Sequence, residues 1–367
     1  MSRTLAQDGE KAYRANSEDA IRGLVAQYLP RIEKAASVRR KNELFAEFDK
    51  AVKQLRLLAF KPQEAEIKSA ATKLAVNEAA FVVSAVKEAS AFELNFNLAQ
   101  KDAEAMASEA LLTPFEGVVL AEAVRRVWAA DVGRISQRFR VSAMRRDNLQ
   151  QATTALLGSN RRGFKDGVVR RVRANLEATV VTATNGIIHR MREQAYAKTP
   201  FIKKERFVAT LDRHTTPICI SNDQRKFKLN EGLFPPLHMN CRSIRVPVFE
   251  FEVLADRPYV AWAERELVAD YTAQAGLPAT KARATLPRGH KGRYDRYARG
   301  RRGEFVGTVD SRVAYPEFLA RQSLAFQQEV LGVRLGKMYR DTGMNITNFI
   351  SRTGRKFTID EVLKRLD

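Results

Sequence analysis

The sequence has few cysteines, no long apolar run and too few acidic residues to balance its cations, and each shortage excludes a class of protein. Two cysteines in 367 residues cannot build a disulfide scaffold, and they suit a reducing cytoplasm. The best apolar run, residues 79–86, is far shorter than the ~18 residues of a membrane span. Residues 1–14 are polar, so we expect no signal peptide and no membrane partner.

The shortage of acidic residues leaves a large positive charge that is unevenly distributed. The chain carries 63 Lys and Arg against 42 Asp and Glu, a net charge of +21, and 45% of its residues are hydrophobic, enough for a packed core. Residues 134–173 hold a net +9 and residues 281–307 a net +7, which is 16 of the 21 excess charges. Such patches usually meet an acidic partner, and nucleic acid is the first candidate.

The N-terminal half has the apolar periodicity of helices. We expect Pro30 to kink or break the first helix and Pro62 to separate the second from the third. A capping box at Thr113 and Glu116, with Pro114 as the first helical residue, is expected to begin the fourth. The predicted helices span residues 17–40, 42–60, 62–96, 113–135 and 162–197.

From about residue 205 the pattern is that of short strands and further helices. Strands over residues 207–212, 225–229 and 243–248 form a small antiparallel sheet, and a helix follows over 259–275. Glycine, proline and charge in residues 276–307 indicate a mobile basic loop. Helices are expected over 315–331 and 360–366, the last capped by Thr358 or Asp360.

The predicted fold class is therefore α+β and predominantly α-helical. An extended N-terminal helical region precedes a small antiparallel β domain with flanking helices. We expect three regions: residues 1–160 (helical N-terminal region), 161–260 (a long helix and the β domain) and 261–367 (the basic loop and closing helices).

Three side chains in the β region are metal-ligand types: Cys219, His238 and Cys241. Structural zinc takes four ligands, commonly from two pairs spaced two to four residues apart, and only the last two residues form such a pair. The predicted fourth ligand is a water or one of three side chains, Asp212, His214 or Asp223.

Two other interpretations of this cluster stay open. Both cysteines can be small apolar fillers where strands meet, with His238 bonded to a backbone carbonyl beside Pro235 and Pro236. A cysteine nucleophile with His238 as base is the other, although no oxyanion hole is recognisable. Arg242 is expected to pair with Asp212 or Asp223, or to be solvated.

Candidate nucleic-acid contacts lie in both basic segments. In the second segment, Tyr294 and Tyr297 alternate with cations and can offer aromatic faces to bases. The alternatives are a disordered linker for the second segment, and a solvated helix face or a contact with an acidic protein for the first. The candidate residues are Arg161, Arg162, Arg170, Arg171, Arg288, Lys291, Arg293, Arg296, Arg299, Arg301 and Arg302.

The β region also resembles a known family. The segments that carry the resemblance are Thr210-Leu211-Asp212, Thr215, Pro217-Ile218-Cys219, Pro235-Pro236-Leu237-His238, Asn240-Cys241-Arg242 and Val246-Pro247, followed by residues 315–332, 336–340 and 357–363. In this order they are similar to the head morphogenesis domain of tailed phages, the family of phage Mu protein F. Its motif residues fall here on Thr210, Asp212, Thr215, Pro217, Pro236 and Arg242. The chain departs from the family pattern at Arg213-His214, at Asp223-Gln224 and at Ser243, where many relatives have a third cysteine.

The resemblance implies a non-enzymatic minor head protein that associates with the portal. Such a protein acts in head assembly, DNA packaging or ejection, and contacts DNA without sequence readout. The implied partners are the portal protein, packaged double-stranded DNA and other head proteins. The implied location is the capsid interior near the portal vertex of the virion, and the host cytoplasm during assembly. No cofactor is expected unless zinc occupies the cysteine–histidine cluster.

Two other functions stay open. The same domain type occurs fused to toxin modules, so a toxin, effector or nuclease is an alternative, although His290 stands alone in the basic C-terminal region. A host nucleoid or RNA-binding protein is disfavoured by the lack of a helix-turn-helix, OB or RRM signature.

Overall fold

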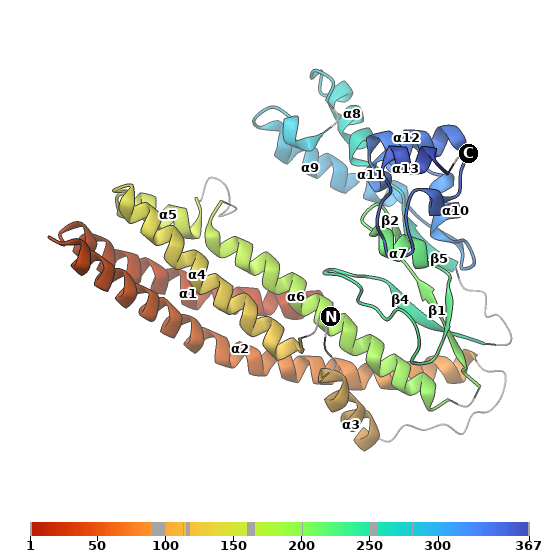
Figure 1. The fold of residues 1–367 in the computed structure, drawn as a ribbon, viewed down its shortest axis with the longest axis horizontal. Helices are drawn as coiled ribbons and strands as arrows, with labels where there is room; N and C mark the ends of the chain where they lie inside the picture. The colour runs from red at the N-terminus through yellow and green to blue at the C-terminus, as the bar shows by residue number, and fades with distance from the viewer. Residues whose placement is uncertain are drawn as a thin grey trace. The chain divides into compact units, whose positions relative to one another are not determined.

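The computed structural model describes residues 2–89, 100–112, 114, 118–159, 166–199, 201–249, 256–280 and 282–365. The chain forms two compact units, residues 1–195 with 238–240, and residues 196–237 with 241–367. The first unit is helical, and the second combines helices with two three-stranded sheets (Figure 1). The predicted α+β, predominantly helical fold class is confirmed.

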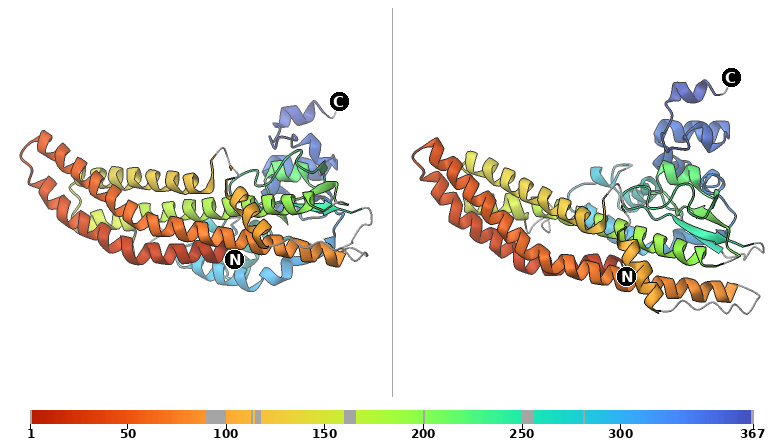
Figure 2. Two further views of the ribbon diagram at one scale, coloured as in Figure 1. Left: turned by 90° about the horizontal axis from the view of Figure 1, so that it is seen from below. Right: turned by 60° about the horizontal axis from the view of Figure 1, so that its bottom comes forward.

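Long helices packed lengthwise build the first unit. Figure 2 shows α1 and α2 side by side, and Phe48 of α2 stacks on Phe139 of α4 with ring centroids 3.8 Å apart. Apolar residues three and four positions apart face this core because those steps fall on one side of a helix. The helices are α1 (Ser2–Glu33), α2 (Val38–Ala89), α3 (Gln100–Leu111), α4 (Leu120–Met144), α5 (Leu149–Leu157) and α6 (Val168–Ala197).

The proline residues interrupt these helices less than the sequence predicts. The predicted separation at Pro62 is wrong, because α2 continues through it. Leu44, Val52 and other buried residues before Pro62, and Ala75 and its neighbours after it, pack in the core, and this packing compensates for the hydrogen bond that a proline removes. Helix α1 ends at Glu33, three residues after Pro30.

The start of α4 differs from the prediction. The helix begins at Leu120, so Pro114 is not its first residue. Thr113 and Glu116, the expected capping box, lie outside the described residues. Helix α6 confirms the last predicted helix from residue 168 onward.

The first unit also buries an ion pair. Arg56 of α2 and Asp131 of α4 are almost fully buried, with Nη2 and Oδ2 2.8 Å apart, and the guanidinium lies 5.6 Å from the ring centroid of Trp128. A buried charge of this kind requires its partner, so the pair fixes how α2 and α4 face each other. No helix in the described part of the chain is long and apolar enough to cross a membrane.

Two sheets form the centre of the second unit. The first, in the order β3 (Lys226–Lys228), β1 (Lys204–Val208), β4 (Ile244–Val248), is antiparallel and confirms the predicted small sheet. The predicted strand 207–212 is divided, because the chain leaves this sheet after Val208. Its last residues, β2 (Leu211–Asp212), pair in parallel with β5 (Asp256–Val260), which pairs antiparallel with β6 (Val306–Asp310). The sequence did not predict this second sheet.

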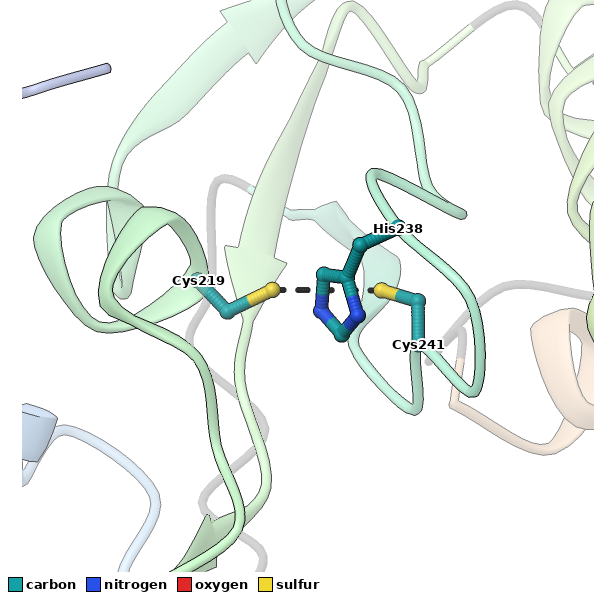
Figure 3. Close-up of side chains that lie close together, drawn as sticks. All are labelled: Cys219, His238 and Cys241. Atoms are coloured by element: carbon teal, nitrogen blue, oxygen red, sulfur yellow. Dashed lines mark hydrogen bonds between the residues drawn. The ribbon is translucent and has the colours of Figure 1, made fainter. Parts of the chain in front are cut away.

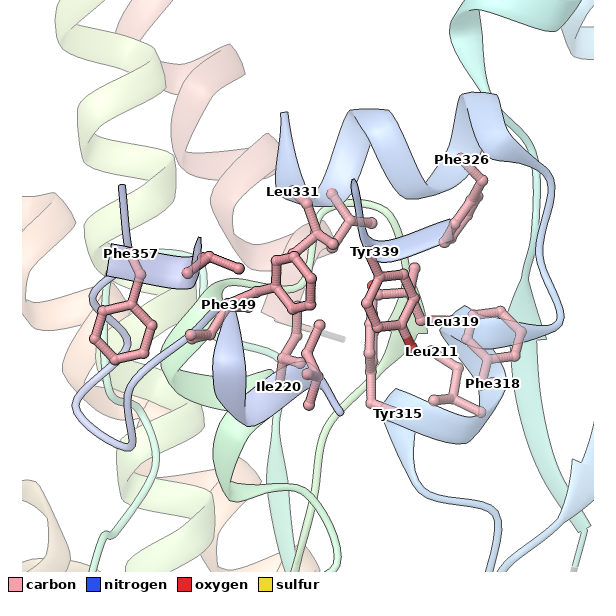
Figure 4. Close-up of a cluster of buried hydrophobic side chains, with 14 of the residues drawn as sticks. Leu211, Ile220, Tyr315, Phe318, Leu319, Phe326, Leu331, Tyr339, Phe349 and Phe357 are labelled. Carbon is pink, nitrogen blue, oxygen red and sulfur yellow. The ribbon is translucent and has the colours of Figure 1, made fainter. Parts of the chain in front are cut away.

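The main core of the second unit lies between these strands and the C-terminal helices. Figure 4 shows Leu211 and Ile220 packed among aromatic side chains, including Phe318 and Phe326. Ser323 divides the predicted helix 315–331, since its hydroxyl accepts from the Phe326 N–H. The helices are α7 (Pro217–Asn222), α8 (Glu264–Gln274), α9 (His290–Gly300), α10 (Tyr315–Ala320), α11 (Leu324–Leu331), α12 (Val333–Thr342) and α13 (Ile359–Leu363). The predicted Thr358 cap of the last helix is confirmed.

The prediction of a mobile loop over residues 276–307 is wrong. Helix α9 packs on α8 through a small separate core in which Leu286 and Tyr294 contact Leu267, Val268 and Tyr271. Glycines and charges dominate the composition of this segment, but its few apolar residues are enough to form a core. Tyr294, Tyr297 and Ala298 are spaced as one helix face, and this face supplies the core that the segment was expected to lack.

One buried carboxylate joins four segments of the second unit. Asp223, after α7, accepts from the Ala209 N–H at 2.7 Å, the Tyr315 N–H at 2.6 Å and both Nη atoms of Arg257 at 3.0 and 2.7 Å. Arg257 of β5 also donates to the carbonyls of Val313 and Ala209. This pair therefore connects three places in the fold: the segment between β1 and β2 where the chain passes from one sheet to the other, the end of α7, and the start of α10.

Candidate metal centre and basic surface

The structure brings the three predicted metal ligands together. Cys219 lies on α7, Cys241 shortly before β4, and His238 three residues earlier in the chain. Their ligand atoms all lie within 4.8 Å of one another, and the two sulfur atoms are 3.8 Å apart. Figure 3 shows the imidazole ring beside the line that joins the sulfurs. Both cysteines are buried and His238 is half-buried.

The chemistry of the donors fits a soft or borderline metal ion. The His238 Nδ1 lies 2.8 Å from the Met239 carbonyl oxygen, which confirms the predicted backbone contact. Because a carbonyl only accepts, Nδ1 carries the hydrogen, and in the neutral ring the lone pair is on Nε2. Two thiols and an imidazole of this form are a typical set of zinc ligands.

The surroundings of Cys219 favour the protonated form of its thiol. The hydrogen bond between Cys219 and Cys241, and then burial, raise the pKa of Cys219 far above its usual value, against a smaller lowering by the Ser243 and Thr216 hydroxyls. A protonated thiol is a poor nucleophile, so this environment disfavours Cys219 as a nucleophile. A bound cation would reverse the balance by stabilising the thiolates.

The three predicted side chains for a fourth ligand do not join the cluster. In the part of the chain that the structure describes, the group of potential ligands contains the two cysteines and His238 only. Asp212 is paired with Arg242 and Asp223 with Arg257. The Ser243 and Thr216 side chains act on the Cys219 thiol, so a hydroxyl or a water is left for the fourth position.

The motif residues beside the cluster form a network around Asp212. Its carboxylate accepts from both Nη atoms of Arg242, one of them at 2.9 Å, and from the His214 N–H at 2.9 Å. Burial raises the pKa of Asp212, but the hydrogen bonds and charge of Arg242 outweigh this and lower it overall. The structure thus selects Asp212, and not Asp223, as the partner of Arg242.

Two threonines and two prolines complete this scaffold. The Thr215 hydroxyl donates to the Thr210 carbonyl at 2.5 Å, and the Thr210 hydroxyl to the Arg242 carbonyl at 3.3 Å. Pro217 occupies the first turn of α7, and Pro236 follows Pro235 through a cis peptide bond. These contacts are internal, so the motif residues position the cysteine-bearing segments.

The second candidate site is the cationic face of α9. On α9 and beside it, the exposed cations that form no ion pair with a described residue are Arg288, Lys291, Arg293, Arg296, Arg299 and Arg302. The nearby carboxylates are engaged by other arginines: Arg283 pairs with Asp295 at 2.5 Å, and Arg301 with Asp270 at 3.0 Å and Glu304 at 2.8 Å.

Three residues of the predicted nucleic-acid contact already have partners within the protein. Arg301 is only partly exposed, and its carboxylate pairs already satisfy it, so it belongs to the scaffold. Tyr294 is buried and Tyr297 half-buried, with ring centroids 5.6 and 5.5 Å from that of Tyr271, so both rings pack on α8 and the Tyr294 ring offers no face to bases.

Few of the predicted nucleic-acid contacts in the first basic segment, residues 134–173, lie within the described residues. Arg161 and Arg162 lie outside the described residues, and the side chains of Arg170 and Arg171 on α6 lie outside them as well. The structure therefore places only the α9 group of the predicted nucleic-acid contacts. The Asp223–Arg257 pair could not be predicted from the sequence, because the two residues are 34 positions apart and no local pattern links them.

No protein-family model, no curated protein and no solved structure matches this chain. The resemblance to the head morphogenesis family accordingly stays a prediction.

Proposed function

We propose that this chain is a non-enzymatic minor head protein of a tailed phage, which associates with the portal and contacts packaged double-stranded DNA. The observation that carries the proposal is the cationic face of α9. Six exposed cations on or beside one packed helix give a fixed array of positive charge, whereas a disordered linker would have to be ordered on binding.

The chemistry of this face suits phosphate contact without base readout. Arginine and lysine neutralise phosphates and release counterions, and this gives affinity that does not depend on sequence. Because the tyrosines of the segment pack inward, no stacking platform favours single strands. A protein that touches packaged DNA of any sequence needs this kind of contact.

We further propose that the cysteine–histidine cluster binds zinc and that the metal has a structural role. Cys219, His238 and Cys241 would hold the ion, which would link α7 to the segment before β4. The metal supplies a cross-link between segments whose thiols are otherwise only neighbours at 3.8 Å. Protein ligands in three positions are compatible with a water or the Ser243 hydroxyl as the fourth.

The zinc proposal is tested by metal content of the purified full chain after dialysis. We expect one zinc per chain in the native sequence and in H290A, a histidine outside the cluster, and loss of zinc in H238A and C241S. Ser243→Cys should tighten binding because a third thiolate completes a structural ligand set. A folded native chain without zinc, or equal losses in H290A and H238A, would contradict the assignment.

The proposed function is tested by quantitative mass spectrometry of purified DNA-filled particles and of nuclease-treated portal rings. Low stoichiometry in both would support a portal-bound head protein. Presence in particles and loss from nuclease-treated rings would mean that DNA holds it. Absence from both would refute the proposal and favour the effector alternative.

A further inference from the structure

Two turns between helices lie at the same end of the first unit, one between α1 and α2 and the other between α4 and α5 (Figures 1 and 2). Phe45 of α2 meets Phe139 of α4 near this end, with ring centroids 6.3 Å apart. Val38 begins α2 seven positions before Phe45, and Met144 ends α4 five positions after the other ring. At a rise of about 1.5 Å per residue, both lie roughly 8–10 Å beyond the aromatic pair. We call residues 33–43 and 144–149 the bundle tip.

The bundle tip exposes large apolar side chains. Val38 is 75% exposed, Met144 78% and Leu149, the first residue of α5, 47%. A single exposed apolar residue is ordinary on a protein surface, whereas several at one place are typical of a contact site. Phe45 and Phe139 fill the core at this level, so burial of the three exposed side chains is not what holds the helices together.

Cations accompany these apolar side chains. The bundle tip contains six Lys and Arg against three Asp and Glu, a net charge of +3. Arg39 and Arg40 share Glu43, at 3.3 and 2.9 Å. The other four cations are exposed and form no ion pair with a described residue: Lys34, Lys41, Arg145 and Arg146. The tip therefore combines apolar contact area with positive charge that the chain itself does not neutralise.

The turn after α4 is fixed by local hydrogen bonds. The Asp147 N–H donates to the Ser142 carbonyl at 3.0 Å, and the Arg146 N–H to the Ala143 carbonyl at 3.2 Å. In this kind of helix ending the residue at position 146 takes a positive φ, here +55°, and is usually glycine. An exposed arginine in a conformation that favours glycine points to a use for its side chain.

We propose that the bundle tip is the docking surface for a partner protein whose own surface is acidic and partly apolar. The positive charge of the tip is complementary to carboxylates, and its three apolar side chains would be covered on binding. Methionine and arginine are also enriched in protein interfaces. The proposal goes beyond the DNA contact and rests on the proposed function only for the identity of the partner, the portal ring.

Two other kinds of partner fit the tip less well. The phosphates of duplex DNA would attract the cations, but they offer nothing to Val38, Met144 and Leu149, which would stay in water. An anionic membrane surface would accept both kinds of side chain. The tip, however, contains no Trp or Tyr, the residues that are enriched at the boundary between membrane and water. The combination of side chains therefore favours a protein.

The test measures the affinity of the full chain for purified, nuclease-treated portal rings by surface plasmon resonance. Two tip variants are compared with controls that make similar changes at exposed positions of the second unit. V38S/M144S/L149S is matched by V306S/V333S/L363S, and R145Q/R146Q by R334Q/R352Q. Each tip variant should weaken binding roughly tenfold or more, and each control less than about twofold.

The variant R146G separates recognition from folding. Because glycine adopts a positive φ without strain, urea unfolding should show R146G to be at least as stable as the native chain, while its affinity for the rings falls. Added salt should weaken binding of the native chain more than binding of R145Q/R146Q, because fewer charge pairs remain to be screened in the variant.

Equal affinity of the native chain and the tip variants for the rings, or equal losses in the tip variants and their controls, overturns the docking surface and leaves the portal association intact. Absence of ring binding by the native chain overturns both proposals. Loss of binding of the tip variants to phosphatidylglycerol vesicles or to a random-sequence duplex, without loss of binding to the rings, shows a lipid or nucleic-acid partner and overturns the proposal.

Discussion

Replacing Asp223 by asparagine removes the charge that the buried Arg257 requires. In the native structure this carboxylate accepts four hydrogen bonds, two from backbone N–H groups and two from the guanidinium, and Arg257 is 5% exposed. Removing one partner of a buried ion pair typically costs about 3–5 kcal/mol because the other charge stays buried and uncompensated. The asparagine side chain can still accept from one N–H group, so we expect a loss in this range for the second unit.

The two tryptophans make this measurable on the full chain. Trp128 lies in the first unit and Trp262 in the second, so in a W128F background the fluorescence during urea unfolding reports the second unit alone. D310N is the matched control, because Asp310 pairs with Arg312 at 2.8 Å at an exposed position of the same unit. We expect its unfolding midpoint to stay close to that of the native chain.

The reasoning is refuted if D223N unfolds at the same urea concentration as D310N. A second variant separates charge from packing: R257Q/D223N has no uncompensated charge and should recover part of the loss. A loss in the double variant equal to the sum of the losses in D223N and R257Q would show that Arg257 contributes independently, by its contacts with the Val313 and Ala209 carbonyls.

Three further predictions concern the second unit. Burial and then the charge of Arg213 lower the pKa of His214 below 6.5. As the pH falls through 6.5, the unfolded chain binds a proton at this histidine before the folded chain does, so the free energy of unfolding should decrease from pH 7 toward pH 5. H214Q should show a flatter pH profile in the same urea assay. Gly354 has a φ of +85° and a Cβ there would lie 2.6 Å from the Ile218 Cβ, so G354A should lower the melting temperature, while G300A, which meets nothing within 4 Å, should not. L286A removes part of the core under α9 and should cost about 2–5 kcal/mol locally, so trypsin should cleave residues 288–302 faster than in the native chain; equal cleavage rates would show that this segment is not held by its core.

Local patterns in the sequence predicted much of the secondary structure and part of the site. Apolar residues at three- and four-residue steps predicted most of α1, α2, α4 and α6, but not α3 or α5, and short runs with aromatic or β-branched residues predicted β3 and β4. The His238 and Cys241 pair was recognisable because ligands three residues apart meet whatever the rest of the chain does. The cap at Thr358 is local in the same way, since it depends on the next three residues.

Contacts between distant segments decided the features that local patterns did not predict. The helix through Pro62 persists because buried residues on both sides of it pack against other helices, and α9 is ordered because its tyrosines meet Tyr271 of α8. Arg242 pairs with Asp212 and not with Asp223, because the Asp223 carboxylate is already paired with Arg257, 34 residues away in the sequence. Lys204 lies opposite Lys228, and Arg206 opposite Lys226, only because of the register in which β1 and β3 pair. Composition and spacing show which residues can ionise, become buried or cap a helix. The partner of each residue depends on chain segments that only folding brings together.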